Sequence, residues 1–214
     1  MDQESSVELS ELELDALAEL VNLGVSNAAL SLREMVREEV LLSVPRVAIV
    51  TREEAIKNLG EQELTKLVAV LQNFEGDING RALLIFPEAK SIELVRAVVG
   101  GHLSLEAIFE LEQEALAETG NVLLNGCLST LANQLGRTLR ISLPEVIYGQ
   151  GSDFFKVTSH SKSSDRVLFI YINFVIRQRN LQGYLAMLLD MPSLVVLKGL
   201  IDAFIERMTG QPAE

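Results

Sequence analysis

The residues with the clearest chemical potential in this sequence are an acid and an amide three positions apart, and this pair occurs twice. Glu19 precedes Asn22, and Glu118 precedes Asn121. In both copies twenty-two residues separate the asparagine from a proline. A carboxylate can pair with a cation, and a carboxamide can donate and accept hydrogen bonds at the same time. The two pairs are therefore suited to contact a basic partner surface.

Helical spacing places both pairs on polar faces, because positions three, four and seven apart return to one side of a helix. The polar stripe of the first copy comprises Asp15, Glu19, Asn22, Ser26 and Arg33, and that of the second comprises Glu114, Glu118, Asn121 and Asn125. Ala18 and Ala117 are small neighbours that leave room for a partner, and Leu23 and Leu30 flank the first stripe. We expect the acid and amide side chains to project together into solvent.

A polar helix face also has a simpler interpretation. The solvated side of a helix in an acidic protein is normally rich in carboxylates and amides. A gene duplication could preserve both copies for reasons of folding, with the asparagines capping or bridging locally. These structural interpretations stay open beside a functional one.

The elements that position these residues follow from caps, periodicity and turn residues. Two capping boxes, each with glutamate three residues after a hydroxyl residue, are Ser10 with Glu13 and Thr51 with Glu54. Helices are predicted over 10–38, 51–60, 88–99, 103–138 and 192–208. Extended segments are predicted over 40–51, 64–74, 81–86, 139–148, 153–160, 166–176 and 183–189. Pro45 inside the segment 40–51 indicates an irregular or edge strand, and the segment 139–148 repeats this strand with Pro144 inside it.

The order of these elements recurs, which indicates an internal repeat. Residues 15–45 align with residues 114–144 at a constant offset of 99 without a gap, and farther along Asn73 matches Asn173. We predict an α+β fold with an internal pseudo-twofold repeat, in which one shared antiparallel β-sheet carries the two long helices on one face.

The repeat also sets the predicted domain limits. A single domain is expected over 9–209, built from repeats of about 9–101 and 103–209. Flexible ends are expected at 1–8 and 210–214.

Composition narrows the partners and the compartment. The 214 residues carry 18 Lys and Arg against 30 Asp and Glu, a net charge of −12 that disfavours nucleic acid as a partner. The single cysteine excludes an internal disulfide framework and fits a reducing compartment. The first residues do not resemble a secretion signal, and the longest apolar stretch is far shorter than the roughly 20 residues of a membrane span. We therefore expect a cytoplasmic protein without a membrane segment.

Other reactive residues offer weaker sites. His102 and His160 do not have metal-ligand spacing with another ligand, and Cys127 falls on the apolar side of its helix, which favours a buried structural thiol over a nucleophile. Asp15 and Glu19 on one helix turn are a poor divalent-cation site without convergent ligands elsewhere. No cofactor is expected to be bound by this chain.

The two patterns together resemble a known signature. Asp15-x3-Glu19-x2-Asn22-x22-Pro45, and the second copy that begins at Glu114, are similar to the paired signature of the CheC/CheX/FliY family of chemotaxis phosphatases. The resemblance covers roughly residues 9–208, and two copies favour a CheC-like member. The second copy departs from the pattern, because Glu114 stands where Asp or Ser is usual.

The resemblance implies a function in two-component signalling: hydrolysis of the phospho-aspartate of a CheY-type response regulator. Asn22 and Asn121 would orient the attacking water, while Glu19 and Glu118 would pair with the regulator's active-site lysine. The required Mg²⁺ would be bound by the regulator. A partnership with the deamidase CheD is also implied. A non-catalytic adaptor that binds CheD or another signalling protein, and a flagellar-switch component, remain alternatives.

Overall fold

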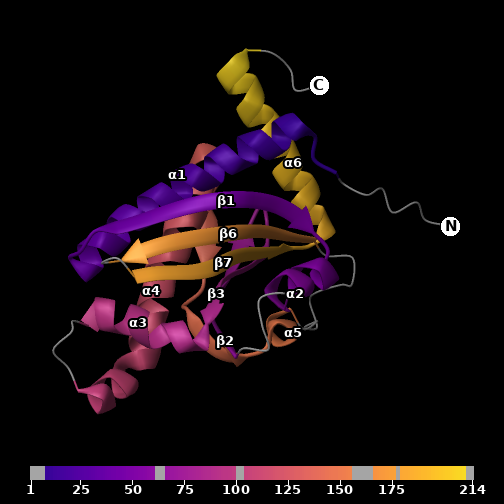
Figure 1. Ribbon diagram of the computed structural model, residues 1–214. Helices are drawn as coiled ribbons and strands as arrows, with labels where there is room; N and C mark the ends of the chain where they lie inside the picture. The colour runs from indigo at the N-terminus through magenta and orange to yellow at the C-terminus, as the bar shows by residue number, and fades with distance from the viewer. Residues whose placement is uncertain (1–7, 61–65, 100–103, 156–165, 177–178, 211–214) are drawn as a thin grey trace.

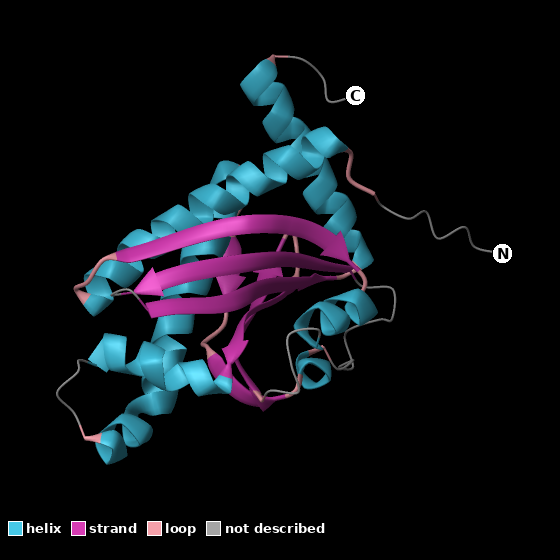
Figure 2. Cartoon of the chain, viewed as in Figure 1, coloured by secondary structure: helices cyan, strands magenta, loops and turns pink. Residues whose placement is uncertain are grey.

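A computed structural model describes residues 8–60, 66–99, 104–155, 166–176 and 179–210. In these ranges an antiparallel sheet forms the middle layer, with helices on both of its faces (Figures 1 and 2). The helices are α1 Glu11–Val36, α2 Arg52–Gly60, α3 Glu88–Val99, α4 Leu105–Gln134, α5 Gly151–Phe154 and α6 Met191–Thr209. Among the described residues we find no helix with the length and apolar character needed to cross a bilayer.

The sheet has seven strands and interleaves early and late parts of the chain. The strands are β1 Val40–Val50, β2 Leu67–Gly76, β3 Gly80–Pro87, β4 Leu139–Ile141, β5 Glu145–Gly149, β6 Arg166–Ile176 and β7 Arg179–Leu189. Their order is β1-β6-β7-β3-β2-β4, and β5 also pairs with β2. Every pairing is antiparallel. If β1, β6 and β7 are exchanged for β4, β2 and β3, respectively, the same order is obtained in the reverse direction.

The two long helices share one face of this sheet. Their buried residues join those of α3 and α6 in one large apolar cluster, in which Leu17 of α1 and Leu116 of α4 are fully buried. The opposite face carries a smaller cluster that contains Ala55 of α2 and Phe154 of α5. Burial of this apolar surface on both faces is the main favourable term in folding, and it fixes which side of α1 and α4 remains outside.

Small residues bring α1 and α4 into close contact with each other. A Cβ atom at Gly24 would lie 3.0 Å from the Cα of Cys127, and one at Gly126 would lie 3.0 Å from the Cα of Ala28. Nearby, Asn27 Nδ2 donates to Thr130 Oγ1 across 3.0 Å. The backbones of α1 and α4 therefore contact each other directly where the helices cross. This contact determines which side of each helix faces outward.

Two predicted elements were wrong. The strand expected over 139–148 is divided into β4 and β5, because Pro144 lacks the N–H of a continuous ladder and Ser142 bonds instead to Asn73, its N–H donating to the Asn73 carbonyl across 2.9 Å. The extended segment expected over 153–160 begins as helix α5, while residues 156–165 lie outside the described ranges. The strand β7 also begins at Arg179, earlier than expected.

The predicted irregular edge strand is confirmed. The strand β1 lies at one edge of the sheet, and its register against β6 shifts between Ser43 and Arg46, beside Pro45. Both capping boxes are also present: Ser10 and Glu13 exchange hydrogen bonds at the start of α1, and Thr51 and Glu54 do so before α2.

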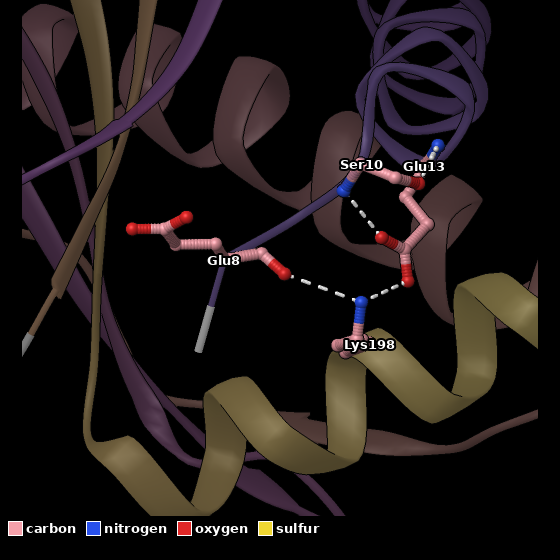
Figure 3. A network of polar contacts seen from close by, with 4 residues as sticks. All are labelled: Glu8, Ser10, Glu13 and Lys198. Carbon is pink, nitrogen blue, oxygen red and sulfur yellow. Dashed lines mark hydrogen bonds and ion pairs between the residues drawn. The ribbon is translucent and has the colours of Figure 1, made fainter. Parts of the chain in front are cut away.

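The capping box of α1 also connects this helix to α6 (Figure 3). Glu13 is 3% exposed, and one of its carboxylate oxygens contacts the ammonium group of Lys198 on α6. The Lys198 Nζ atom also donates to the carbonyl of Glu8 across 3.2 Å. A single buried carboxylate thus closes the helix N-terminus and holds the C-terminal helix against it.

The pKa values of the two neighbouring carboxyl groups, Glu13 and Asp202, are shifted in opposite directions. Burial raises the pKa of Glu13, but hydrogen bonds from Lys198, Ser10 and Asp202 outweigh it and bring the pKa down to about 2. Burial raises the pKa of Asp202, as do its hydrogen bond to Glu13 and the Glu13 charge. Asp202 therefore keeps its proton more readily than Glu13 does.

Glu13→Gln is expected to flatten the dependence of stability on pH. Glutamine can still accept from the Ser10 N–H, so the substitution removes the charge but keeps the cap. Because the folded pKa of Glu13 lies below 4.5, its contribution is present above that pH and is lost as the pH falls toward 2. Asp202 opposes this change, so we expect a net difference on the order of 1–2 kcal/mol.

Denaturant unfolding at pH 7 and pH 3 measures this difference. Glu11→Gln, at an exposed position in the first turn of α1, is the matched control and should keep the parent's difference in unfolding free energy between the two pH values. If Glu13→Gln also kept the parent's difference, the assigned role of the network would be contradicted.

Candidate functional site

The first acid and amide pair lies on the outer face of α1. Glu19 and Asn22 are both exposed, and within the described ranges neither side chain has a hydrogen bond or an ion pair. The residues around them share this exposure, and Leu23 and Leu30 are 39% and 59% exposed. The pair is therefore available to another molecule, as predicted from the helical spacing, with an apolar rim beside it.

The second pair is built differently. Glu118 is exposed on α4, but Asn121 is half-buried and its Oδ1 atom accepts two hydrogen bonds. Gln72 Nε2 of β2 donates across 3.0 Å, and Asn125 Nδ2, one helical turn farther along α4, donates across 2.7 Å. The expectation that the whole second stripe projects into solvent was wrong at Asn121 and Asn125, because both residues are half-buried and the Asn121 amide is hydrogen-bonded to Gln72 of β2.

A close approach of helix and strand makes this contact possible. A Cβ atom at Gly120 would lie 2.4 Å from Cγ1 of Val70, so α4 rests directly on β2 at this point. Val70 and Gln72 point to the same face of β2, since alternate strand residues share a face. Glycine immediately before Asn121 thus brings the asparagine within reach of the Gln72 side chain.

The loop between β4 and β5 completes the surroundings of Asn121. Gln72 Nε2 also donates to the backbone carbonyl of Ser142 across 3.0 Å. The Ser142 hydroxyl accepts from the backbone N–H of Asn73 across 3.0 Å and donates to the carbonyl of Leu143 across 3.0 Å. The segment that carries the signature proline is therefore fastened beside the asparagine, and Leu143 stands 89% exposed at its tip.

Gln72 is a site residue that the sequence interpretation missed. It is fully buried in β2, directly after the apolar run from Leu67 to Leu71. A polar residue at a core position of a strand is uncommon and is normally hydrogen-bonded. The available signal was that Gln72 continues the alternation of Val68 and Val70 on one face of the strand. Aligning Asn73 with Asn173 pairs Gln72 with Ile172 of β6, which is buried and apolar.

The described ranges bear on two other kinds of site, a metal site and a reactive thiol. No group of three or more His, Cys, Asp or Glu residues there could hold a metal ion. Cys127 is buried in the core, and burial raises the pKa of its thiol to about 12. His102 and His160 lie outside the described residues.

Comparison with known sequences identifies a family profile and two related proteins. The profile described as "Chemotaxis phosphatase CheX" matches residues 68–170. CheC1 of Halobacterium salinarum is 26% identical over 148 residues, which are 69% of this chain and 73% of that protein. The CheY-P phosphatase CheC of Bacillus subtilis is 25% identical over 141 residues, 64% of this chain and 67% of that protein.

Comparison with solved structures supports the same fold. The crystal structure of Thermotoga maritima FliY superimposes with a TM-score of 0.74, and the match covers 92% of this chain and 100% of that one. Sequence identity in this match is 16%, so it establishes the architecture and not the chemistry.

Cys127 is expected to resist thiol reagents in the folded protein. The thiolate is the reactive form, and both burial and a pKa of about 12 suppress it. Labelling with a disulfide reagent at pH 8 should be at least about a hundredfold slower than in denaturant. Because the chain has one cysteine, the signal is unambiguous. Rapid labelling of the native protein would contradict the assignment of a buried structural thiol.

Proposed function

We propose, because the chain belongs to the CheC/CheX/FliY family of chemotaxis phosphatases, that it hydrolyses the phospho-aspartate of a CheY-type response regulator. The name of the Bacillus subtilis relative gives the same substrate class for that protein. In this reaction a water oxygen bonds to phosphorus while the bond from phosphorus to the aspartate oxygen breaks. The products are the free aspartate carboxylate and inorganic phosphate, which takes the oxygen and both protons of the water.

One observation carries the proposal: an acid and an amide recur at the same spacing on two long helices, with Glu19, Asn22 and Glu118 exposed and Asn121 half-buried. In our proposal Asn22 and Asn121 enter the regulator's active site and position the attacking water. Glu19 and Glu118 pair with the regulator's active-site lysine. The matching pairs also support our proposal that the two halves are copies of one ancestral unit.

This division of labour fits the physical demands of phosphoryl transfer. The reaction depends mainly on positioning and on neutralising charge on the phosphoryl oxygens. A carboxamide can accept from the water and donate to a phosphoryl oxygen. Mg²⁺ and most of the positive charge would belong to the regulator. In our proposal this chain positions the water and docks the regulator, and its net charge of −12 suits a basic partner surface.

We also propose that the reaction takes place in the cytoplasm.

The double variant Asn22→Ala with Asn121→Ala is expected to lower phosphate release by about a hundredfold or more, by analogy with loss of other positioned hydrogen-bond donors. The assay uses a CheY-type regulator of the same organism, phosphorylated with acetyl phosphate, and follows inorganic phosphate. Asn133→Ala, an exposed asparagine on α4, is the matched control and should keep the parent rate. Hydrolysis at the parent rate by the double variant would exclude the proposed catalytic role.

The double variant Glu19→Ala with Glu118→Ala is expected to weaken binding of the regulator by about tenfold, and to reduce the dependence of binding on salt, because two ion pairs are removed. Titration at two salt concentrations measures both effects. Glu34→Ala with Glu110→Ala changes the net charge equally on the same two helices and serves as the control. Equal affinity and salt slope in both double variants would contradict specific pairing with the lysine.

The adaptor alternative gives a different result in these assays. A chain that only docks CheD or another signalling protein would bind its partner after both asparagine changes, and the lifetime of the phosphorylated regulator would be the same with and without it.

A further inference from the structure

We propose that Gln72 and Asn125 are positioning residues for Asn121, which hold its carboxamide by the oxygen and leave the amide nitrogen as its outward group. The inference rests on the phosphatase function proposed above. It adds a difference between the two sites, since the first pair presents a free amide and the second a fixed hydrogen-bond donor.

The orientation of the amides follows from a group that cannot rotate. The backbone carbonyl of Ser142 is an acceptor only, so the Gln72 atom 3.0 Å from it must be the Nε2 donor. The same Nε2 atom lies 3.0 Å from the Asn121 side chain, which must therefore present its oxygen there. Asn125 Nδ2 donates to this oxygen across 2.7 Å. The Ser142 carbonyl thus fixes the orientation of the Gln72 amide, and the Gln72 amide in turn fixes that of Asn121.

The chemical consequence lies in the number of lone pairs. A carboxamide oxygen has two, and both are used when Gln72 and Asn125 donate to Asn121. The outward-facing group of Asn121 is then its NH₂, which can donate to a phosphoryl oxygen or to the oxygen of the water. In this state its oxygen cannot accept a hydrogen bond from the water, which the oxygen of an unrestrained asparagine can do.

The first site lacks two components of this arrangement. The offset of 99 pairs Gly120, where α4 rests on β2, with Val21 of α1, and the alignment of the strands pairs Gln72 with Ile172. Both Val21 and Ile172 are buried and apolar. Asn22 is exposed and has no hydrogen bond within the described ranges, so both ends of its amide can turn toward a partner.

Burial keeps the amides of the second site in this arrangement. Gln72 is fully buried, so water cannot easily replace Asn121 as its partner. Its Oε1 atom has no hydrogen-bond partner among the described residues. An apolar side chain of similar length should therefore be tolerated at this position, since it removes an unpaired buried acceptor together with the donor. Gln72→Met is thus a substitution that removes the positioning bond and retains the volume.

The test isolates the second site in an Asn22→Ala background. Phosphate release is measured against the acetyl phosphate-treated regulator, with and without Gln72→Met. We expect kcat to fall about tenfold while KM changes less than about twofold, because Glu118 still docks the regulator. In an Asn121→Ala background, where the positioned group is absent, Gln72→Met should cause no further loss. Damage to the fold would instead lower both backgrounds.

Nuclear magnetic resonance of the free protein gives a readout that does not depend on activity. The side-chain NH₂ group of Asn121, assigned by its loss in Asn121→Ala, should show restricted motion in nitrogen-15 relaxation, whereas that of the exposed Asn22 should be mobile. Gln72→Met should shift the Asn121 signals and raise their mobility toward that of Asn22. Asn121 signals that match those of Asn22 in the parent protein would overturn the inference.

The results separate the two proposals. If Asn22→Ala with Asn121→Ala retains full activity, the phosphatase proposal fails, and the resonance measurement still decides whether Gln72 holds Asn121. If the double variant is inactive but Gln72→Met leaves kcat unchanged in the Asn22→Ala background, the positioning role is overturned while the phosphatase proposal stands.

Discussion

The close packing of α1 and α4 on one sheet face and on each other is the constraint on which the rest of the structure depends. Glycine and alanine at the crossing, at Gly24, Ala28 and Gly126, let the backbones touch. Each helix must bury one side against its partner and another against the sheet. Only one stripe per helix is left for solvent; Glu19, Asn22 and Glu118 are exposed on it, and Asn121 of the same stripe is half-buried. The positions of the candidate groups are thus set by the core and not by local loops.

Caps and periodicity were sufficient to predict most of this scaffold. The capping box at Ser10 and the turn residues after Phe74 are local signals, so the helix start and the hairpin agree with the structure. The error at Pro144 lay where tertiary contacts override local preference. The division of the strand at Pro144 depends on the bonds between Ser142 and Asn73, which belong to different parts of the chain. A pattern in one segment contains no information on such a partner.

The candidate site shows the same limit. Helical spacing predicted that Glu19, Asn22 and Glu118 would be exposed, because exposure follows from the position of the apolar stripe on the same helix. It failed at Asn121, whose environment depends on Gln72, a residue 49 positions away in the sequence. Two segments with nearly the same pattern can therefore differ in hydrogen bonding, since each is completed by a strand that the pattern does not include.

The interleaved strand order has a consequence for how the protein can assemble. Within the described ranges the edge strand β1 pairs with β6, and β4 and β5 pair with β2, so each half of the chain supplies neighbours for strands of the other half. Cleavage of the chain between α3 and α4 would divide these pairs, and neither fragment would contain the complete sheet. The two fragments are therefore expected to fold only in each other's presence.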